Sequence, residues 1–423
     1  MVSHEYWESY HKQLGALDLD WRPTSFIPRD WALNVSDIAS EWVEQQFAAH
    51  IAGRPLVSAP PELDPETMVV CGQLALVLAE AYQHPIKLDI DVIRYNEALA
   101  KRESGLNDSH EEALLAKFPP AKRLVLDRPS VVIDSSYWII LWYLPGALHW
   151  SLQRDMYNTT IRMGNLLKQS ITTGKASTGQ SSKWRTHSSN FYAAQEPQLT
   201  PGCINISPFW FQQGHERHGP PPVNPGIGFV PEVSATLKGD RSLSVIRDMQ
   251  RPGLVSSATL RVMHPQLYRA SLSTHVELGN WAATQALDVM YRCLQHWTSV
   301  YTGAAIMCNR QSPSHRDPKC PPEGFDILTC IGGYGHGVMQ LTNLGIELAY
   351  DPGVMVSYSG RLVRHSVQVA KGDRIVWAWF MRDSVHNYAR TPRTEYAKYN
   401  LADFAIYHLA EYNQADFVQY RTL

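Results

Sequence analysis

The stretch Val354–Met381, VMVSYSGRLVRHSVQVAKGDRIVWAWFM, has the composition of β-strands separated by turns. Valine, tyrosine, isoleucine and tryptophan dominate three short runs, and segments that contain glycine lie between them. Lys371-Gly372-Asp373 is expected to form a hairpin turn between the last two runs. The three predicted strands are Val354–Tyr358, Leu362–Val369 and Arg374–Met381.

Similar runs extend back to residue 299. They are Tyr301–Cys308, Phe325–Ile331, Gly337–Leu341 and Ile346–Tyr350, and Asp351-Pro352-Gly353 is expected to form a turn after the last of them. With an extended segment at His315, this makes about eight strands in roughly ninety residues, the number found in a jelly roll. We therefore expect residues 299–390 to form a double-stranded β-helix core.

The rest of the chain favours helices, which makes the fold class α+β. We expect residues 1–125 to be a mostly helical region, 126–298 to be a cover of helices and loops, and 391–423 to be a C-terminal helix. Residues 201–235 are rich in glycine and proline and are expected to be irregular. Helices are predicted over Ile38–Ile51, 65–83, Ile90–Ala100, Ala147–Leu167 and Asn280–Thr298, and a capping box at Ser109–Glu112 is expected to start another.

Composition excludes some classes of protein. The 423 residues carry a net charge of −2, so no global charge indicates nucleic acid or a membrane surface. No run of about eighteen apolar residues predicts a membrane span, and the first residues do not have the pattern of a signal peptide. The six cysteines are widely spaced and form no C-x-x-C pair, which predicts the reduced thiols of an intracellular protein.

Two stretches lack acidic residues. Residues 156–195 carry Arg162, Lys168, Lys175, Lys183 and Arg185, and residues 249–276 carry Arg251, Arg261 and Arg269. Local basic patches of this kind can follow a phosphate backbone, so we expect the basic loop within residues 126–298 to contact DNA. The alternative interpretation of the first stretch is a solvated loop.

His315-Arg316-Asp317 is the candidate metal-binding motif. Side chains two positions apart on an extended segment point to the same side, so His315 and Asp317 can face one ion. A second, distant histidine would complete the 2-His-1-carboxylate triad that binds Fe(II) and leaves open positions. Zinc is less favoured, because no third imidazole or cysteine lies at ligand spacing. A chain with 17 histidines contains about one His-x-Asp triplet by chance. Whether this triplet binds a metal therefore depends on the strands around it.

His365 and Arg374 are the candidates that complete the site. Valines occupy the odd positions of Leu362–Val369, so His365, which is also odd, is expected to face inward. If Lys371-Gly372 is a turn, Arg374 points to the same side of the sheet as His365. A metal ligand and a guanidinium on one face fit a dicarboxylic keto acid, with its far carboxylate bound by the arginine. The alternative is a structural histidine and an arginine paired with Asp373 or Glu347.

Several motifs in this half of the chain can be compared with known families. They are Asn309-Arg310-x-Ser312-Pro313-x-His315-Arg316-Asp317, Asp326-Ile327-Leu328, Tyr350-Asp351-Pro352-Gly353, Ser359-Gly360-Arg361-x-x-Arg364-His365, Gly372-Asp373-Arg374, Phe380-Met381-Arg382-Asp383-x-x-His386 and, further upstream, Trp142-Tyr143-Leu144-Pro145-Gly146. Together they resemble the TET/JBP group of Fe(II)- and 2-oxoglutarate-dependent dioxygenases, especially its fungal branch. The resemblance is specific over about residues 299–390 and does not extend to residues 1–125.

The resemblance implies an enzyme that flips a methylated base out of DNA and oxidises its methyl group, with Fe(II) and 2-oxoglutarate as cofactors. The product would be an oxidised form of 5-methylcytosine (hydroxymethyl, formyl or carboxyl), or adenine from N6-methyladenine. Nuclear location follows from such a substrate, and no protein partner is evident. His315, Asp317 and His365 would bind the metal, and Arg374 and Asn309 would bind 2-oxoglutarate. The candidates for substrate contacts are Arg382, Asp383, His386, Asp326 and Asp351.

Two alternatives remain open at this point. The same scaffold could hydroxylate a small molecule or a protein, or the chain could be an inactive DNA-binding module. Asp351, which precedes Pro-Gly, is also a common type of turn former. Cys320 occupies the position three residues after the metal-binding aspartate, where relatives often place a contact to the base, so the identity of the base is open.

Overall fold

The structure is a computed structural model of the chain. It describes residues 27–100, 107–117, 119–120, 123–173, 184–212, 230–239, 242–317, 320–369, 371–391 and 394–400. The predicted helix over 391–423 lies mostly outside these residues, as do Lys175 and Lys183.

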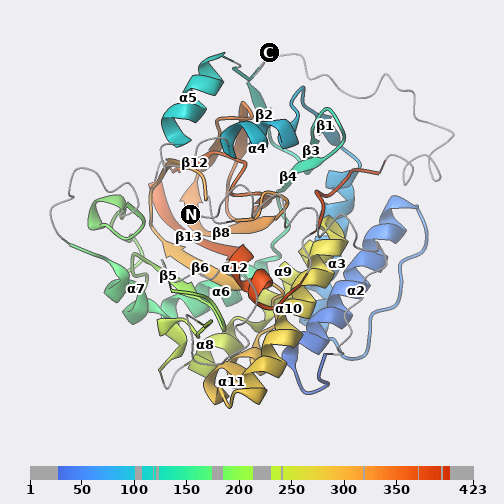
Figure 1. Ribbon diagram of the computed structural model, residues 1–423, viewed down its shortest axis with the longest axis vertical. Helices are drawn as coiled ribbons and strands as arrows, with labels where there is room; N and C mark the ends of the chain where they lie inside the picture. Colours follow the sequence, from blue (N-terminus) through green and yellow to red (C-terminus); the bar gives the residue numbers. More distant parts are fainter. Residues whose placement is uncertain are drawn as a thin grey trace.

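Eight consecutive strands form two facing antiparallel sheets. The larger sheet contains the order β11-β8-β13-β6 and the smaller one the order β10-β9-β12-β7. Consecutive strands mostly alternate between the sheets, so the fold is the predicted double-stranded β-helix, inside an α+β architecture (Figure 1). The strands are β6 (Gly303–Cys308), β7 (Ser312–His315), β8 (Asp326–Gly335), β9 (Val338–Leu341), β10 (Ile346–Ala349), β11 (Met355–Tyr358), β12 (His365–Gln368) and β13 (Lys371–Phe380).

The predicted turn at Lys371-Gly372-Asp373 is wrong. These residues begin β13, where Lys371 pairs with Gly335 and Gly372 pairs with Tyr334 of β8. Gly372 has a φ of +104°, and a Cβ there would lie 2.3 Å from the carbonyl oxygen of Gly333. The glycine therefore allows a close approach of two strands, and β12 and β13 belong to different sheets.

Further strands widen both sheets. The larger sheet gains β1 (Pro85–Lys87), β3 (Ser130–Ile133) and β4 (Ile139–Leu144) on one side and β5 (Gly202–Ile206) on the other, while β2 (Leu124–Leu126) joins the smaller sheet in parallel with β10. The strand β5 corrects the expectation that residues 201–235 are wholly irregular. Its alternating run is only five residues long and is surrounded by proline and glycine.

Helices cover the outer face of the larger sheet, as expected from the apolar residues of β13 on that side. Figure 1 shows α2, α3, α9 and α10 gathered on one side of the molecule. The helices are α2 (Ala32–Ile51), α3 (Pro65–Tyr82), α4 (Val92–Ala100), α5 (Asn107–Lys117), α6 (Trp150–Arg162), α7 (Gly164–Ser170), α8 (Ser242–Asp248), α9 (Gln250–Met263), α10 (Pro265–Thr284), α11 (Asp288–His296) and α12 (Asp383–Tyr388).

Three helix boundaries differ from the prediction. The helix expected over 147–167 is divided at Met163 into α6 and α7. The helix expected over 280–298 is divided between α10 and α11, where Ala286 has a left-handed φ of +53°. The helix expected to start at the capping box begins earlier, at Asn107, so Ser109 lies inside α5. Apolar periodicity continues across these breaks, so it does not reveal them.

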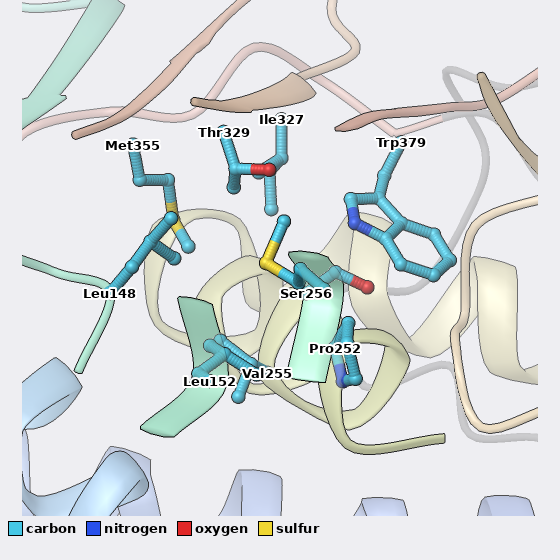
Figure 2. Close-up of a pocket in the computed structure, with 10 residues that line it drawn as sticks. Leu148, Leu152, Pro252, Val255, Ser256, Ile327, Thr329, Met355 and Trp379 are labelled. Atoms are coloured by element: carbon cyan, nitrogen blue, oxygen red, sulfur yellow. The ribbon is translucent and has the colours of Figure 1, made fainter. Parts of the chain in front are cut away.

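The sheet and the helices enclose an apolar core around Trp142, Trp377 and Trp379. A small apolar cavity lies in this layer, between α6, α9 and the larger sheet, and Figure 2 shows Leu152, Val255 and Trp379 in its wall. A second cluster fills the space between the two sheets of the jelly roll. Fold stability therefore depends on two apolar layers that share the larger sheet.

The arginines of the second acid-free stretch bind other helices. Arg251 on α9 forms ion pairs with Asp155 of α6 and Glu66 of α3. Arg261 binds Glu44 at 2.7 Å and Asp37 at 3.0 Å, both on α2. These contacts connect helices within the fold, which is contrary to the expectation that both arginines follow a phosphate backbone.

The six cysteines all lie among the described residues, where they are buried and form no disulfide. In the part of the chain that the structure describes, no helix has the length and apolar character needed to cross a membrane.

Candidate metal centre

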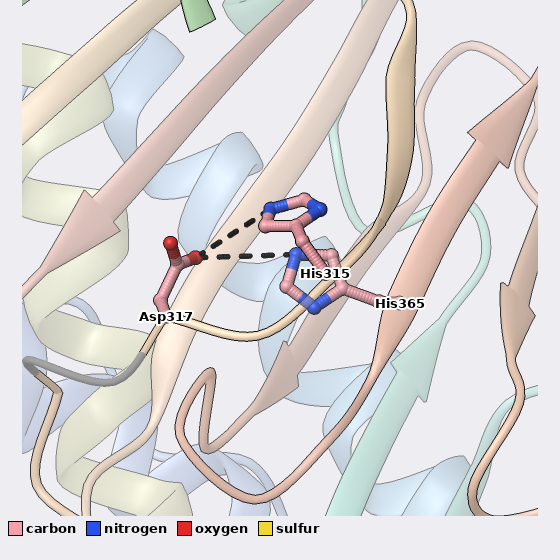
Figure 3. A group of neighbouring side chains, drawn as sticks. All are labelled: His315, Asp317 and His365. Atoms are coloured by element: carbon pink, nitrogen blue, oxygen red, sulfur yellow. Dashed lines mark ion pairs between the residues drawn. The ribbon is translucent and has the colours of Figure 1, made fainter. Parts of the chain in front are cut away.

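The jelly roll brings His315, Asp317 and His365 together. His315 ends β7 and His365 begins β12, and the two are direct partners in the antiparallel register of these strands. Asp317 follows two residues after His315, and its Oδ2 lies 3.9 Å from Nε2 of His315 and 4.0 Å from Nε2 of His365. Figure 3 shows both rings directed at this carboxylate. One possible ligand atom from each residue lies within 4.8 Å of the others, which is the arrangement of a facial triad.

Backbone carbonyls orient both imidazoles. Nδ1 of His315 donates to the carbonyl of Pro313 at 2.7 Å, and Nδ1 of His365 donates to that of Val363 at 3.1 Å. Because a carbonyl only accepts, the proton lies on Nδ1 and the lone pair of Nε2 faces the aspartate. The rings therefore present the atoms that a metal ion requires.

The protonation states also suit a metal ion. Burial, with the adjacent His365, lowers the pKa of His315 to about 3, and burial lowers the pKa of His365. Burial raises the pKa of Asp317, but Arg185 and the two imidazoles, where these are protonated at low pH, outweigh it and lower the pKa to about 2. Two neutral imidazoles and one carboxylate are thus available at neutral pH.

A segment of the first acid-free stretch covers the triad. Nη2 of Arg185 donates to Oδ1 of Asp317 at 2.7 Å, which leaves Oδ2 toward the histidines. The ring of Trp184 lies 4.6 Å from that of His315, and the guanidinium of Arg310 lies 5.0 Å from the Trp184 ring. The sequence marked this stretch only by its charge, and it gave no sign that Arg185 would reach a metal ligand 132 residues away.

Arg374 points into the jelly roll from the sheet opposite His365. On β13, Val376 belongs to the core between the sheets, whereas Ile375 and Trp377 face the helices. Arg374 lies two residues before Val376, so its side chain points to the same face of β13, and it is 4% exposed. The expectation that Arg374 and His365 share one face of one sheet is therefore wrong, although both side chains face the same interior.

The surroundings of Arg374 fit an anionic ligand. Nη2 of Arg374 donates to the carbonyl of Arg310, and Tyr192 lies beside the guanidinium. Within the described residues, Nε of Arg374 and Nε of the neighbouring Arg310 are buried without a hydrogen-bond partner. Buried donors of this kind are costly unless a ligand accepts from them, so the site suits a small dicarboxylate.

Asn309, expected to contact the co-substrate, has both ends of its amide engaged within the protein. Its Nδ2 donates to Asp373 at 2.7 Å, and its Oδ1 accepts from the backbone N–H of Arg374 at 2.9 Å. The residue is fully buried and has a left-handed φ of +53°, a conformation that asparagine tolerates better than most residues. These bonds hold the strand that carries Arg374.

Two of the substrate-contact candidates lie next to the triad. A Cβ on Gly360 would meet Oδ2 of Asp326 at 2.8 Å and Cβ of Asp317 at 3.2 Å, so both carboxylates flank this glycine. Nη1 of Arg382 lies 4.0 Å from Sγ of Cys320, and Cys320 also hydrogen-bonds Asp326. Burial raises the pKa of Asp326 to about 7. Cys320 is thus part of a polar cluster with both candidates.

The other three candidates have different surroundings. Asp351 is exposed in the turn before β11, and its Oδ1 accepts from the backbone N–H of Gly337 at 3.1 Å. Asp383 lies in the first turn of α12, and Nδ1 of His386 lies 3.4 Å from the hydroxyl of Thr274 on α10. The contact of Asp351 is that of a turn former, and His386 faces the helical layer.

A family model matches the part of the chain that carries this site. Residues 234–383 match the family model Tet_JBP, the oxygenase domain of the 2OGFeDO superfamily, and the interval includes the whole triad and Arg374. The chain is similar to NgTET1 in complex with 5mC DNA, with 12% identity, a TM-score of 0.37, and coverage of 75% of this chain and 99% of that chain. It is also similar to OsALKBH1, with 12% identity, a TM-score of 0.26, and coverage of 61% and 99%. No curated protein matches it in sequence.

The family match confirms the TET/JBP resemblance, while membership of the fungal branch stays a prediction. Members of this superfamily use Fe(II) and 2-oxoglutarate, and the triad and Arg374 supply suitable groups for both. Fe(II) and 2-oxoglutarate are therefore the cofactors.

Proposed function

We propose that this chain, which contains an oxygenase domain of the 2OGFeDO superfamily over residues 234–383, oxidises the methyl group of a methylated base in DNA. The observation that carries the proposal is the His315–Asp317–His365 triad inside a jelly roll whose facing sheet supplies Arg374. The family match limits the reaction to that of an Fe(II)- and 2-oxoglutarate-dependent oxygenase. The methylated base and the DNA context belong to the proposal.

Each residue of the site has a distinct task. His315, Asp317 and His365 would hold Fe(II), and Arg374 would bind the far carboxylate of 2-oxoglutarate through its guanidinium. When bound, these cofactors supply the oxidation, in which oxygen is consumed, 2-oxoglutarate becomes succinate and carbon dioxide, and a C–H bond of the substrate becomes C–OH. Arg185 keeps Oδ2 of Asp317 toward the metal position, and Asn309 holds the backbone of Arg374.

The substrate base must leave the DNA stack, because a stacked methyl group cannot reach a metal inside the jelly roll. Asp326 and Arg382, which adjoin Asp317, are the residues we assign to the base. Both 5-methylcytosine and N6-methyladenine remain substrates of the proposal. Oxidation of the first leaves a stable hydroxymethyl group, whereas the hydroxymethyl group on nitrogen is lost as formaldehyde. A DNA substrate also implies a nuclear location in a cell that has a nucleus.

The test is mass spectrometry of methylated oligonucleotides incubated with the full chain, Fe(II) and 2-oxoglutarate. Duplexes and single strands that carry 5-methylcytosine or N6-methyladenine are compared, with His315→Ala as the control. A product mass that appears only with the wild-type chain supports the proposal. If the chain leaves every methylated oligonucleotide unchanged, the proposed substrate class is wrong.

A second candidate is the hydroxylation of a small molecule or a protein. It is favoured by the ion pairs of the basic residues, because Arg162 binds Asp248 and Arg251 and Arg261 bind carboxylates of other helices. These guanidiniums already bind carboxylates of the fold, which reduces the positive charge that they offer to phosphates. Succinate formation that responds to a small molecule or a peptide, but not to methylated DNA, would favour this candidate.

A further inference from the structure

A buried carboxylate of the N-terminal region contacts two residues that adjoin the metal ligands. Glu111 lies on α5, which Figure 1 shows next to β12, and it is fully buried. It is separated from its two arginine partners by 205 and 253 residues of sequence. The contact therefore joins α5 to the segments that carry the metal ligands.

Glu111 accepts three hydrogen bonds from charged or polar groups. Its Oε2 accepts from Nε of Arg316 at 2.9 Å and from Nη1 of Arg364 at 3.0 Å. Its Oε1 accepts from the hydroxyl of Tyr95 on α4 at 2.8 Å. The two arginine side chains are only 10% and 14% exposed, so water screens these contacts weakly.

Both arginines are neighbours of metal ligands. Arg316 lies between His315 and Asp317, and Arg364 directly precedes His365. One carboxylate therefore holds residues from both segments that build the triad.

The arginines also cross-link these two segments. Nη1 of Arg316 donates to the carbonyl of Arg361, in the turn before β12, at 3.1 Å. Nε of Arg364 donates to the hydroxyl of Ser314 on β7 at 3.1 Å. Each arginine thus binds the segment that carries the other.

Electrostatics explains why the carboxylate is needed. Two guanidiniums that converge in a poorly solvated space repel each other, and one negative charge between them offsets the repulsion. Without it the arginines are expected to separate, and the ends of β7 and β12 that carry the histidines would move with them. The triad requires these ends to stay in register, because His315 and His365 are direct partners.

We propose that α4 and α5 position the metal ligands through this set of residues, Glu111, Arg316, Arg364 and Tyr95, which we call the Glu111 clamp. Glu111 is a positioning residue and touches no metal ligand side chain. The proposal adds to the proposed function a role for the N-terminal region, and it rests only on the metal site of that function, not on its substrate. Loss of a supporting contact around metal ligands commonly weakens metal affinity by about 10–100-fold.

The experiment is titration of the metal-free full chain with Co(II) under anaerobic conditions, followed by visible absorption. Glu111→Gln keeps the shape of the side chain and removes its charge, and we expect at least a tenfold higher Kd for Co(II). Glu112→Gln is the matched control, because Glu112 is the exposed neighbour on the same helix, and its Kd should equal that of the wild type. Circular dichroism of each metal-free variant checks that it is folded.

A folded Glu111→Gln variant with the wild-type Kd would overturn the clamp, and so would an equal loss in Glu112→Gln. If Glu111→Gln does not fold, Arg364→Lys replaces it, since lysine keeps the charge but cannot bridge Glu111 and Ser314 as the guanidinium does. An unchanged Kd in that variant overturns the proposal. Failure of the DNA assay leaves the cobalt result intact, so the two proposals can fail separately.

Discussion

The two faces of strand β13 carry different kinds of residue. Ile375, Trp377 and Trp379 face the helices and are at most 2% exposed. Arg374 and Val376 face the space between the sheets, where buried polar atoms remain without partners in the described residues. One face packs against helices, and the other presents a buried guanidinium that suits an anionic ligand. We therefore expect stability and chemistry to be separable by substitutions on a single strand.

The largest effect is expected from the ligand-binding side. Asp317→Ala removes the only carboxylate of the triad, and we expect turnover to fall below detection and Co(II) binding to be lost. The metal-free variant should lose less stability than a truncation in the apolar core would cause, because it loses the ion pair with Arg185 but no apolar packing. A variant that keeps wild-type turnover would show that the metal lies elsewhere.

The helix-facing side should respond in stability. Trp377→Ala removes a fully buried ring whose Nε1 donates to Thr160 on α6 at 3.1 Å, and we expect a loss of about 3–5 kcal/mol in the free energy of unfolding by urea. Thr160→Val removes this hydrogen bond and the one that the Thr160 hydroxyl donates to the carbonyl of Met156 at 2.8 Å, and it should cost about 1–3 kcal/mol. If folded Trp377→Ala binds Co(II) much more weakly than the wild type, the two faces are not independent.

The helical layer should also show a pH dependence of its own. Nδ1 of His264 accepts from the backbone N–H of Leu267 at the start of α10, and its Nε2 donates to the carbonyl of Glu395 at 2.9 Å. Burial lowers the pKa of this imidazole to about 4, below its ordinary value of 6.5. As the pH falls, the unfolded chain therefore takes up the proton first. The contribution of neutral His264 to the stability of the fold is complete above pH 6.5 and decreases between pH 6.5 and about 4.

His264→Asn keeps a helix-capping acceptor that does not titrate. Between pH 6.5 and 4, the free energy of unfolding should fall by about 3 kcal/mol less in this variant than in the wild type. Urea titrations at several pH values measure the difference. His84→Asn, at an exposed position, is the control, and its free energy of unfolding should change with pH as that of the wild type does. An identical slope in His264→Asn would show that this histidine is not the source.

The smallest effect is expected from a conservative change on the inner face. Arg374→Lys keeps the charge but loses the planar pair of donors, and we expect the KM for 2-oxoglutarate to rise about 10–100-fold while Co(II) affinity stays the same. Initial rates of succinate formation at varied 2-oxoglutarate measure the change. An unchanged KM would remove Arg374 from the co-substrate site.

Much of the core could be predicted from the sequence. Strand composition and short turns are local properties, so the eight runs between 301 and 381 correspond to β6–β13. The spacing of His315 and Asp317, with the parity of His365, predicted a triad that the structure assembles. Breaks such as the one at Ala286 were missed, because a left-handed residue without glycine leaves no pattern in the sequence.

Other features were decided only by the tertiary structure. Local pattern showed which residues alternate within a strand. It did not show that β12 and β13 lie in facing sheets, so that Arg374 and His365 approach each other from opposite sheets. It showed a basic stretch, but the fold placed Arg185 on Asp317 and tied Arg251 and Arg261 to other helices. No pattern in the sequence indicated that Glu111 would bind Arg316 and Arg364. Each of these contacts joins residues far apart in the chain, and side chains that meet only after the layers pack cannot be identified from local pattern.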